Sequence, residues 1–114
     1  MDKDQMEKLT KEYQTLEEQL QALAMQREQF RELKEETKNA LEEVEKAKGK
    51  VFLAVGGIMV DVEKEIASNN LKERQESATM RLGIIERQLE EAKKKEQALR
   101  EQITNALKDL KQQD

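Results

Sequence analysis

The chain has 114 residues, of which 40% are charged and only three are aromatic, and its net charge is −4. Few chains this charged build a globular core, so a compact enzyme with a large buried pocket is not expected. The absence of His and Cys excludes His-based triads, thiol nucleophiles, the usual zinc clusters and disulfides. We therefore expect no enzyme, no cofactor and no metal site.

The lack of Pro favours long uninterrupted helices, because a helix interior tolerates Pro least. The start of the chain lacks an apolar signal region, and the longest apolar stretch, residues 51–60, is too short to span a bilayer. The net negative charge argues against a general phosphate-binding role. We expect a cytoplasmic protein that binds neither membrane nor nucleic acid.

Residues 5–47 follow a heptad repeat, in which apolar residues at positions a and d form the seam of a coiled coil. Nine of the twelve a and d residues are apolar, and the three polar ones could fix the register. The twelve are Met6, Leu9, Tyr13, Leu16, Leu20, Leu23, Arg27, Phe30, Lys34, Thr37, Leu41 and Val44.

A second heptad run begins at Leu71, and ten of its twelve seam residues are apolar. Two arms of equal length joined by a short insert predict an antiparallel pair of helices within a single domain, residues 1–114, with both termini at one end. The second helix could start at Asn70, which has capping-box spacing to Glu73, or near Glu63, giving a helix over 64–112. The seam residues are Leu71, Gln75, Ala78, Leu82, Ile85, Leu89, Ala92, Glu96, Leu99, Ile103, Ala106 and Leu110.

Residues 51–62 are nearly uncharged and rich in β-branched residues, which predicts a β-hairpin turning at Gly56-Gly57. Both faces of this hairpin are apolar, and an isolated two-stranded hairpin is marginal in water. We favour hairpins from several subunits closing a shared sheet or β-barrel over one folded back on the arms of a monomer. The expected oligomerisation residues are Val51, Phe52, Leu53, Val55, Ile58, Met59, Val60 and Val62.

This layout resembles the β-class subunits of prefoldin. The pattern Val55-Gly56-Gly57 followed by aliphatic residues, with Phe52 before it, is similar to the hairpin of that family, and residues 85–88 (IERQ) are similar to a run in archaeal β subunits. A single β-hairpin is the feature of the β class. The resemblance implies a mainly α-helical fold: a long antiparallel two-helix coiled coil with a central β-hairpin that assembles into an intersubunit β-barrel.

The resemblance further implies a heterohexamer of two α-class and four β-class subunits, ATP-independent capture of unfolded proteins, and their delivery to a group II chaperonin. The sequence independently lacks the GxxxxGK[ST] loop that would hold phosphates. Apolar residues gather where the two arms end, and fraying there would expose an adaptable surface. These candidate client-binding residues are Met1, Met6, Leu9, Tyr13, Ile103, Leu107 and Leu110.

Other interpretations stay open. All of these residues except Leu107 and Met1 could simply pack in the seam, and clients could instead bind the inner faces of the arms near Met25, Met80 and Ile84. The alternative function is a structural coiled-coil tether or adaptor for one folded partner. A guide for RNA is disfavoured, because residues 1–47 carry 8 basic and 13 acidic groups.

Overall fold

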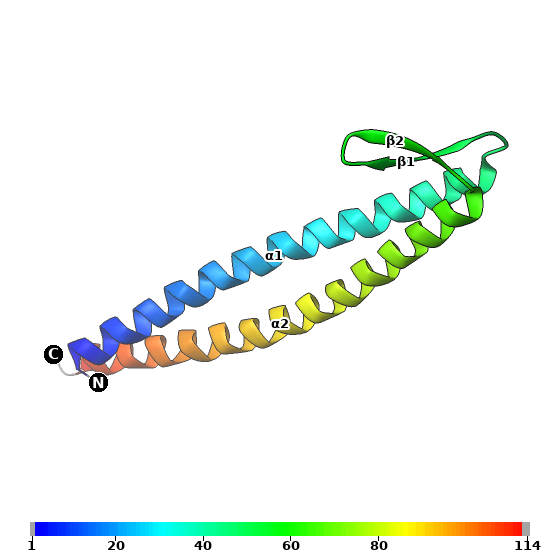
Figure 1. The fold of residues 1–114 in the computed structure, drawn as a ribbon. Coiled ribbons are helices and arrows are strands. Elements are labelled where there is room, and N and C mark those ends of the chain that lie inside the picture. Colours follow the sequence, from blue (N-terminus) through cyan, green and yellow to red (C-terminus); the bar gives the residue numbers. More distant parts are fainter. Residues whose placement is uncertain (1, 113–114) are drawn as a thin grey trace. The chain divides into compact units, whose positions relative to one another are not determined.

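A computed structural model describes residues 2–112. The described chain forms a long helix α1 (Lys3–Lys46), two short strands β1 (Val51–Val55) and β2 (Ile58–Val62), and a second long helix α2 (Lys64–Gln112). The strands pair as one antiparallel two-stranded sheet (Figure 1). The prediction of a mainly helical chain with two long helices and a central β-hairpin is confirmed.

Contacts divide the chain into two compact units, and both helices run through both of them. The terminal unit comprises Met1–Gln26 and Ile85–Asp114, and the hairpin unit comprises Arg27–Ile84 with the β-hairpin. Within the terminal unit, the first part of α1 lies antiparallel to the last part of α2 (Figure 1). The start of α1 and the end of α2 therefore share one end of that unit.

The buried residues follow the heptad seam. All twelve seam residues of α1 are buried or half-buried, as are eleven of the twelve in α2. The exception is Leu110, whose relative exposure is 43%. Because neither helix could bury this stripe alone, the packing of one against the other is what stabilises them. Among residues 2–112, the least exposed are Leu16, Thr37, Ala67, Ala78, Ile85, Leu89, Ala92 and Ala106.

The residues near each helix start explain where the helix begins. At the start of α1, the backbone N–H of Gln5 donates to Asp2 Oδ1 (2.8 Å), while the backbone N–H of Asp2 donates to Gln5 Oε1 (3.1 Å). This reciprocal pair is a capping box, which satisfies two backbone donors that a helix start leaves free. Helix α2 begins at Lys64, so Asn70 lies inside the helix and does not cap it.

Burial explains why α2 starts earlier than its heptad run. Ala67 is only 2% exposed, although the heptad counted back from Leu71 places the next seam position at Ser68. A four-residue step from Ala67 to Leu71 has the spacing of a coiled-coil stutter, which unwinds the coil locally. The seam thus continues through the first turns of α2 in a shifted register.

Two polar side chains of the hairpin unit, Thr37 in the seam and Arg81 outside it, have partners of their own. The Thr37 hydroxyl donates to the carbonyl oxygens of Leu33 and Lys34, both at 2.9 Å, so its burial leaves no unpaired donor. The guanidinium of Arg81 lies 5.6 Å from the centre of the Phe30 ring, within the range of a cation–π contact between the two helices.

Gly83 lies inside α2, where it lowers the stability of the helix. Close packing does not require a glycine there, since a Cβ built at this position would meet no atom within 4 Å. We expect Gly83→Ala to stabilise the fold by about 1 kcal/mol, because Ala has the higher helix propensity. For a chain of this size, thermal unfolding followed by circular dichroism should show a rise in Tm of about 4 °C. As a control, Gly57→Ala should lower Tm, since Gly57 has φ +85°. A lower Tm for Gly83→Ala would mean that the glycine is required.

Candidate assembly and client-binding surfaces

A two-residue loop joins the two strands of the β-hairpin. Val55 pairs with Ile58 and Val51 with Val62, leaving a loop of Gly56 and Gly57 alone. Both glycines have positive φ angles, +53° and +85°, as a type I′ turn requires. The predicted primed turn is therefore confirmed. Its register puts all of the β-branched strand residues on one face, the aliphatic face, which Val51, Leu53, Val55, Ile58, Val60 and Val62 form.

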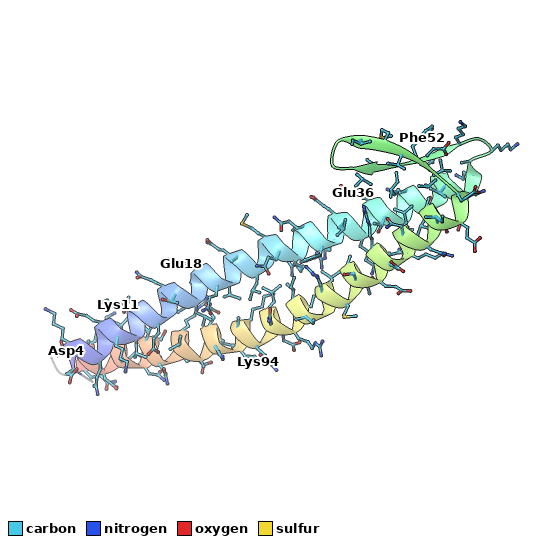
Figure 2. The ribbon with its side chains drawn as sticks, viewed as in Figure 1. Asp4, Lys11, Glu18, Glu36, Phe52 and Lys94 are labelled. Atoms are coloured by element: carbon cyan, nitrogen blue, oxygen red, sulfur yellow. The ribbon has the colours of Figure 1, made fainter. Side chains whose placement is uncertain are left out.

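Both faces of the β-hairpin expose apolar side chains. On the aliphatic face, Val51, Leu53 and Val62 are half-buried at the base of the strands, whereas the residues nearer the turn are exposed. On the other face, Phe52 (Figure 2) and Met59 are 51% and 65% exposed. The single chain covers only the base of the ribbon, and large apolar side chains remain open to solvent. The exposed large residues of the ribbon are Phe52, Val55, Ile58, Met59 and Val60.

Polar contacts fix the base of the β-hairpin. The Lys64 ammonium group donates to the backbone carbonyls of Glu45 (2.7 Å) and Ala47 (3.3 Å), which the end of α1 leaves without helical partners. Across the strands, Lys50 Nζ lies 3.5 Å from Asp61 Oδ2. Lys64 therefore joins the end of α1 to the start of α2, a role that sequence analysis did not identify.

The candidate client-binding residues of the terminal unit differ in exposure. Leu107 and Leu110 are 48% and 43% exposed. Met6, Leu9, Tyr13 and Ile103 are half-buried along the seam. Met1 lies outside the described residues. Of these candidates, the ones exposed without any rearrangement are therefore Leu107 and Leu110 near the end of α2, and the half-buried ones would become available only if the helix ends fray.

A polar cluster crosses the seam of the terminal unit. The Tyr13 hydroxyl donates to Glu96 Oε1 (2.8 Å), and Arg100 Nη2 donates both to the Tyr13 hydroxyl (3.3 Å) and to Glu96. Glu96 occupies a seam position, and this cluster gives its carboxylate two partners. The hydrogen bond from Arg100 lowers the pKa of Tyr13, but the Glu96 acceptor and partial desolvation together outweigh it, so the pKa lies above its usual value.

The Tyr13 cluster can be followed by titration, because Tyr13 is the only tyrosine and the chain has no tryptophan. We expect phenolate absorbance to appear at a higher pH in the folded chain than in the urea-unfolded chain. Since the folded pKa is raised, the stability from this cluster is present below the ordinary tyrosine value of 10.0 and is lost as the pH rises through the folded pKa. Glu96→Gln should lower the folded midpoint. Equal midpoints in the folded and unfolded chains would contradict the cluster.

Large apolar residues are also exposed on the outer faces of the helices. Met25 is 66% exposed in the terminal unit, and Met80 and Ile84 are 67% and 42% exposed in the hairpin unit. The structure adds Ile66 at 57% and Leu33 at 38%, which sequence analysis did not select. Both lie in the hairpin unit but outside its seam. They could have been noticed in the sequence as large apolar residues that do not occupy a or d positions of the heptad.

Charged side chains cover much of the remaining surface. Figure 2 shows Glu18 and Lys94 of the terminal unit pointing away from the neighbouring helix. Lys94 Nζ lies 3.9 Å from Glu90 Oε1, an i,i+4 pair of the kind that supports an exposed helix. Within residues 2–112, no group of three or more acidic residues could hold a metal ion. No helix in the same range is long and apolar enough to cross a membrane.

Two comparisons with known proteins found matches. The sequence matches the family described as "Prefoldin subunit" over residues 7–110. Among solved structures, the crystal structure of the prefoldin beta subunit from Thermococcus strain KS-1 is similar, with a TM-score of 0.81 and 30% sequence identity over 90% of this chain and 92% of that chain. A search among curated proteins found no match.

Proposed function

Because the chain belongs to the prefoldin subunit family, we propose that it is a β-class subunit of a cytoplasmic chaperone that holds unfolded proteins without ATP. The family assignment gives the chain a chaperone-type function. The finer role is capture of unfolded clients at the ends of the coiled coil and their delivery to a group II chaperonin. The observation that carries the proposal is one exposed apolar β-hairpin on a two-helix coil, which is also the fold of the similar beta subunit.

Assembly takes place through the β-hairpin. Exposed aliphatic residues on one face, and Phe52 and Met59 on the other, favour burial against hairpins of other subunits. Each strand also has one edge without a partner in the described chain, and pairing with a further strand would satisfy those backbone groups. We propose that four copies of this chain join two α-class prefoldin subunits in one hexamer around a shared β-barrel.

Client capture takes place at the free ends of the coil. Leu107 and Leu110 are already exposed there, and Met6, Leu9, Tyr13 and Ile103 add apolar surface as the ends fray. Met1, which lies outside the described residues, belongs to the same proposed set. Each contact of this kind is weak. Several coils in one hexamer engage the same unfolded chain together, and this multivalency raises the overall affinity without tight binding at any single end.

Aggregation assays test the proposed function. The chain, assembled with an α-class prefoldin subunit, should suppress aggregation of several chemically unrelated unfolded proteins, and omission of ATP should make no difference. Folded forms of the same proteins should bind poorly, because their apolar side chains are buried. Binding confined to one folded partner, with no suppression of aggregation, would favour the coiled-coil tether instead.

A further inference from the structure

One side of the terminal unit is hollowed along its length. Three grooves lie there, the first of about 650 Å³, the second of about 470 Å³ and the third of about 400 Å³, and the first shares lining residues with each of the other two. Lys8, Glu12 and Gln102 line both the first and the second. Leu16, Gln19 and Lys95 line both the first and the third. Together they form one furrow, which follows α1 from Gln5 to Gln26.

Six side-chain amides line the walls of this furrow, and one of them, Gln5, is hydrogen-bonded to Asp2. Gln19, Gln26, Gln88, Gln102 and Asn105 are all exposed, and within the described chain none of them makes a hydrogen bond. Each amide offers both a donor and an acceptor. The floor is apolar, since it comes from the seam residues Leu9, Leu16, Leu23, Ala92, Leu99 and Ala106.

The furrow is lined by equal numbers of basic and acidic residues, whereas acidic residues outnumber basic ones in the groove on the other side of the coil. Three lysines (Lys8, Lys11 and Lys95) and three acids (Glu12, Glu91 and Asp109) line the furrow. The groove on the other side is lined mainly by charged residues, which are Glu17, Lys93, Glu96, Arg100 and Glu101, together with Leu20 and Gln97. The furrow is therefore neutral and richer in amides than the groove that Glu17, Lys93 and Arg100 line.

We propose that this furrow binds an extended segment of an unfolded client through the client's main chain, an inference that rests on the proposed holding function. The amides of Gln19, Gln88 and Gln102 donate to and accept from the client's peptide groups, while its apolar side chains contact the seam residues of the floor. Peptide groups are common to every sequence, so this mode of binding suits clients that share no motif. It also discriminates against folded proteins, whose buried peptide groups are already paired.

Length and surface chemistry favour this occupant over a helix from a second copy. Gln5 and Gln26 are 21 residues apart, so the furrow is about 32 Å long along the helix. Roughly ten residues of an extended chain would span that length. A docking helix would need an unpaired apolar stripe. The large apolar residues that the terminal unit exposes are Met25, Leu107 and Leu110, and their positions make no heptad stripe.

Replacing amides with methionine tests the proposal, because Met has nearly the size and helix propensity of Gln but cannot donate a hydrogen bond. The furrow variant combines Gln19→Met, Gln88→Met and Gln102→Met. The matched control combines Gln14→Met, Gln21→Met and Gln97→Met, three exposed glutamines of the same unit that do not line the furrow. Circular dichroism and native mass verify that both variants keep the helices and the assembly of the wild type.

The probe is fluorescently labelled lactalbumin, kept unfolded by reduction and carboxymethylation, and fluorescence anisotropy gives its Kd. We expect the furrow variant to bind about tenfold more weakly, since three lost hydrogen bonds outweigh the added apolar surface, while the control changes by less than about twofold. Equal or tighter binding by the furrow variant would overturn the proposal, because it would show that the furrow binds the client through apolar contacts alone. A changed native mass in the furrow variant alone would also overturn it, because the occupant would then be a second copy.

A second arm tests main-chain recognition directly. An unlabelled ten-residue peptide of alternating Val and Ser should compete with the probe, and the same peptide with N-methylated peptide groups should compete at least about tenfold less well. Equal competition would overturn main-chain recognition. Failure of the wild type to bind the probe at all would overturn the proposed holding function itself, so the two failures are distinguishable.

Discussion

Replacing Val60 with Asp should abolish the hexamer while leaving the helices intact. Val60 pairs with Leu53 across the hairpin, on the aliphatic face that the proposed barrel buries, and it is 43% exposed in the single chain. In the monomer the carboxylate can reach water. In the assembly it would be buried without a partner, at a cost of several kcal/mol per subunit. Native mass spectrometry and circular dichroism of the variant with an α-class subunit measure both properties.

Met80→Asp is the matched control for this prediction. Met80 is 67% exposed on α2, and the same change of an apolar residue to a carboxylate should leave the hexamer at its normal mass. Loss of assembly in both variants would indicate a general effect of charge. A Val60→Asp chain that still forms a hexamer of normal mass would contradict assembly through the hairpin.

Deleting residues 1–9 and 107–114 should reduce client affinity far more than it reduces stability. The deletion removes Met1, Met6, Leu9, Leu107 and Leu110 but keeps most of each seam, as well as the Tyr13–Glu96 hydrogen bond between the two helices. A loss of only ~1.4 kcal/mol per coil end weakens each contact tenfold, and the losses compound when several ends hold one client. Aggregation suppression by the truncated hexamer, after its mass and helicity are verified, measures the effect.

The competing location for client binding is the inner faces of the arms near the exposed residues Met25, Met80 and Ile84. A second variant that replaces all three with Gln, within the untruncated chain, separates the two. We expect this variant to keep most of its activity and the truncated chain to lose most of it. Full activity of the truncated hexamer would rule out client binding at the coil ends.

Heptad periodicity predicted the two helices well, because the spacing of apolar residues along the sequence indicates which side of each helix is buried. The β-hairpin was predicted as directly, since Gly56-Gly57 supplies the two positive φ angles and β-branched residues flank it. Both features depend on local chemistry, which a single sequence contains. The end of the second seam is different: the register set by Tyr13 and Glu96 places Leu110 beyond the start of α1, so this heptad residue is exposed.

Contacts between residues far apart in the chain were not predicted. The Tyr13–Glu96–Arg100 cluster and the Lys64 contact with Glu45 depend on which residues face each other across the coil, and heptads do not fix that alignment. The start of α2 was left open for a related reason: Ala67 is buried in a shifted register that the heptad count did not include. The furrow likewise requires the alignment of both helices, because residues of each form its walls.

Native mass spectrometry of the chain, alone and after mixing with an α-class prefoldin subunit, is the direct test of assembly through the β-hairpin. We expect one hexamer that contains four copies of this 13.3 kDa chain and two α-class subunits. The Val60→Asp chain should be absent from that complex. A chain that stays monomeric after mixing, with its β-hairpin unpaired, would contradict assembly through the hairpin and the chaperone that depends on it.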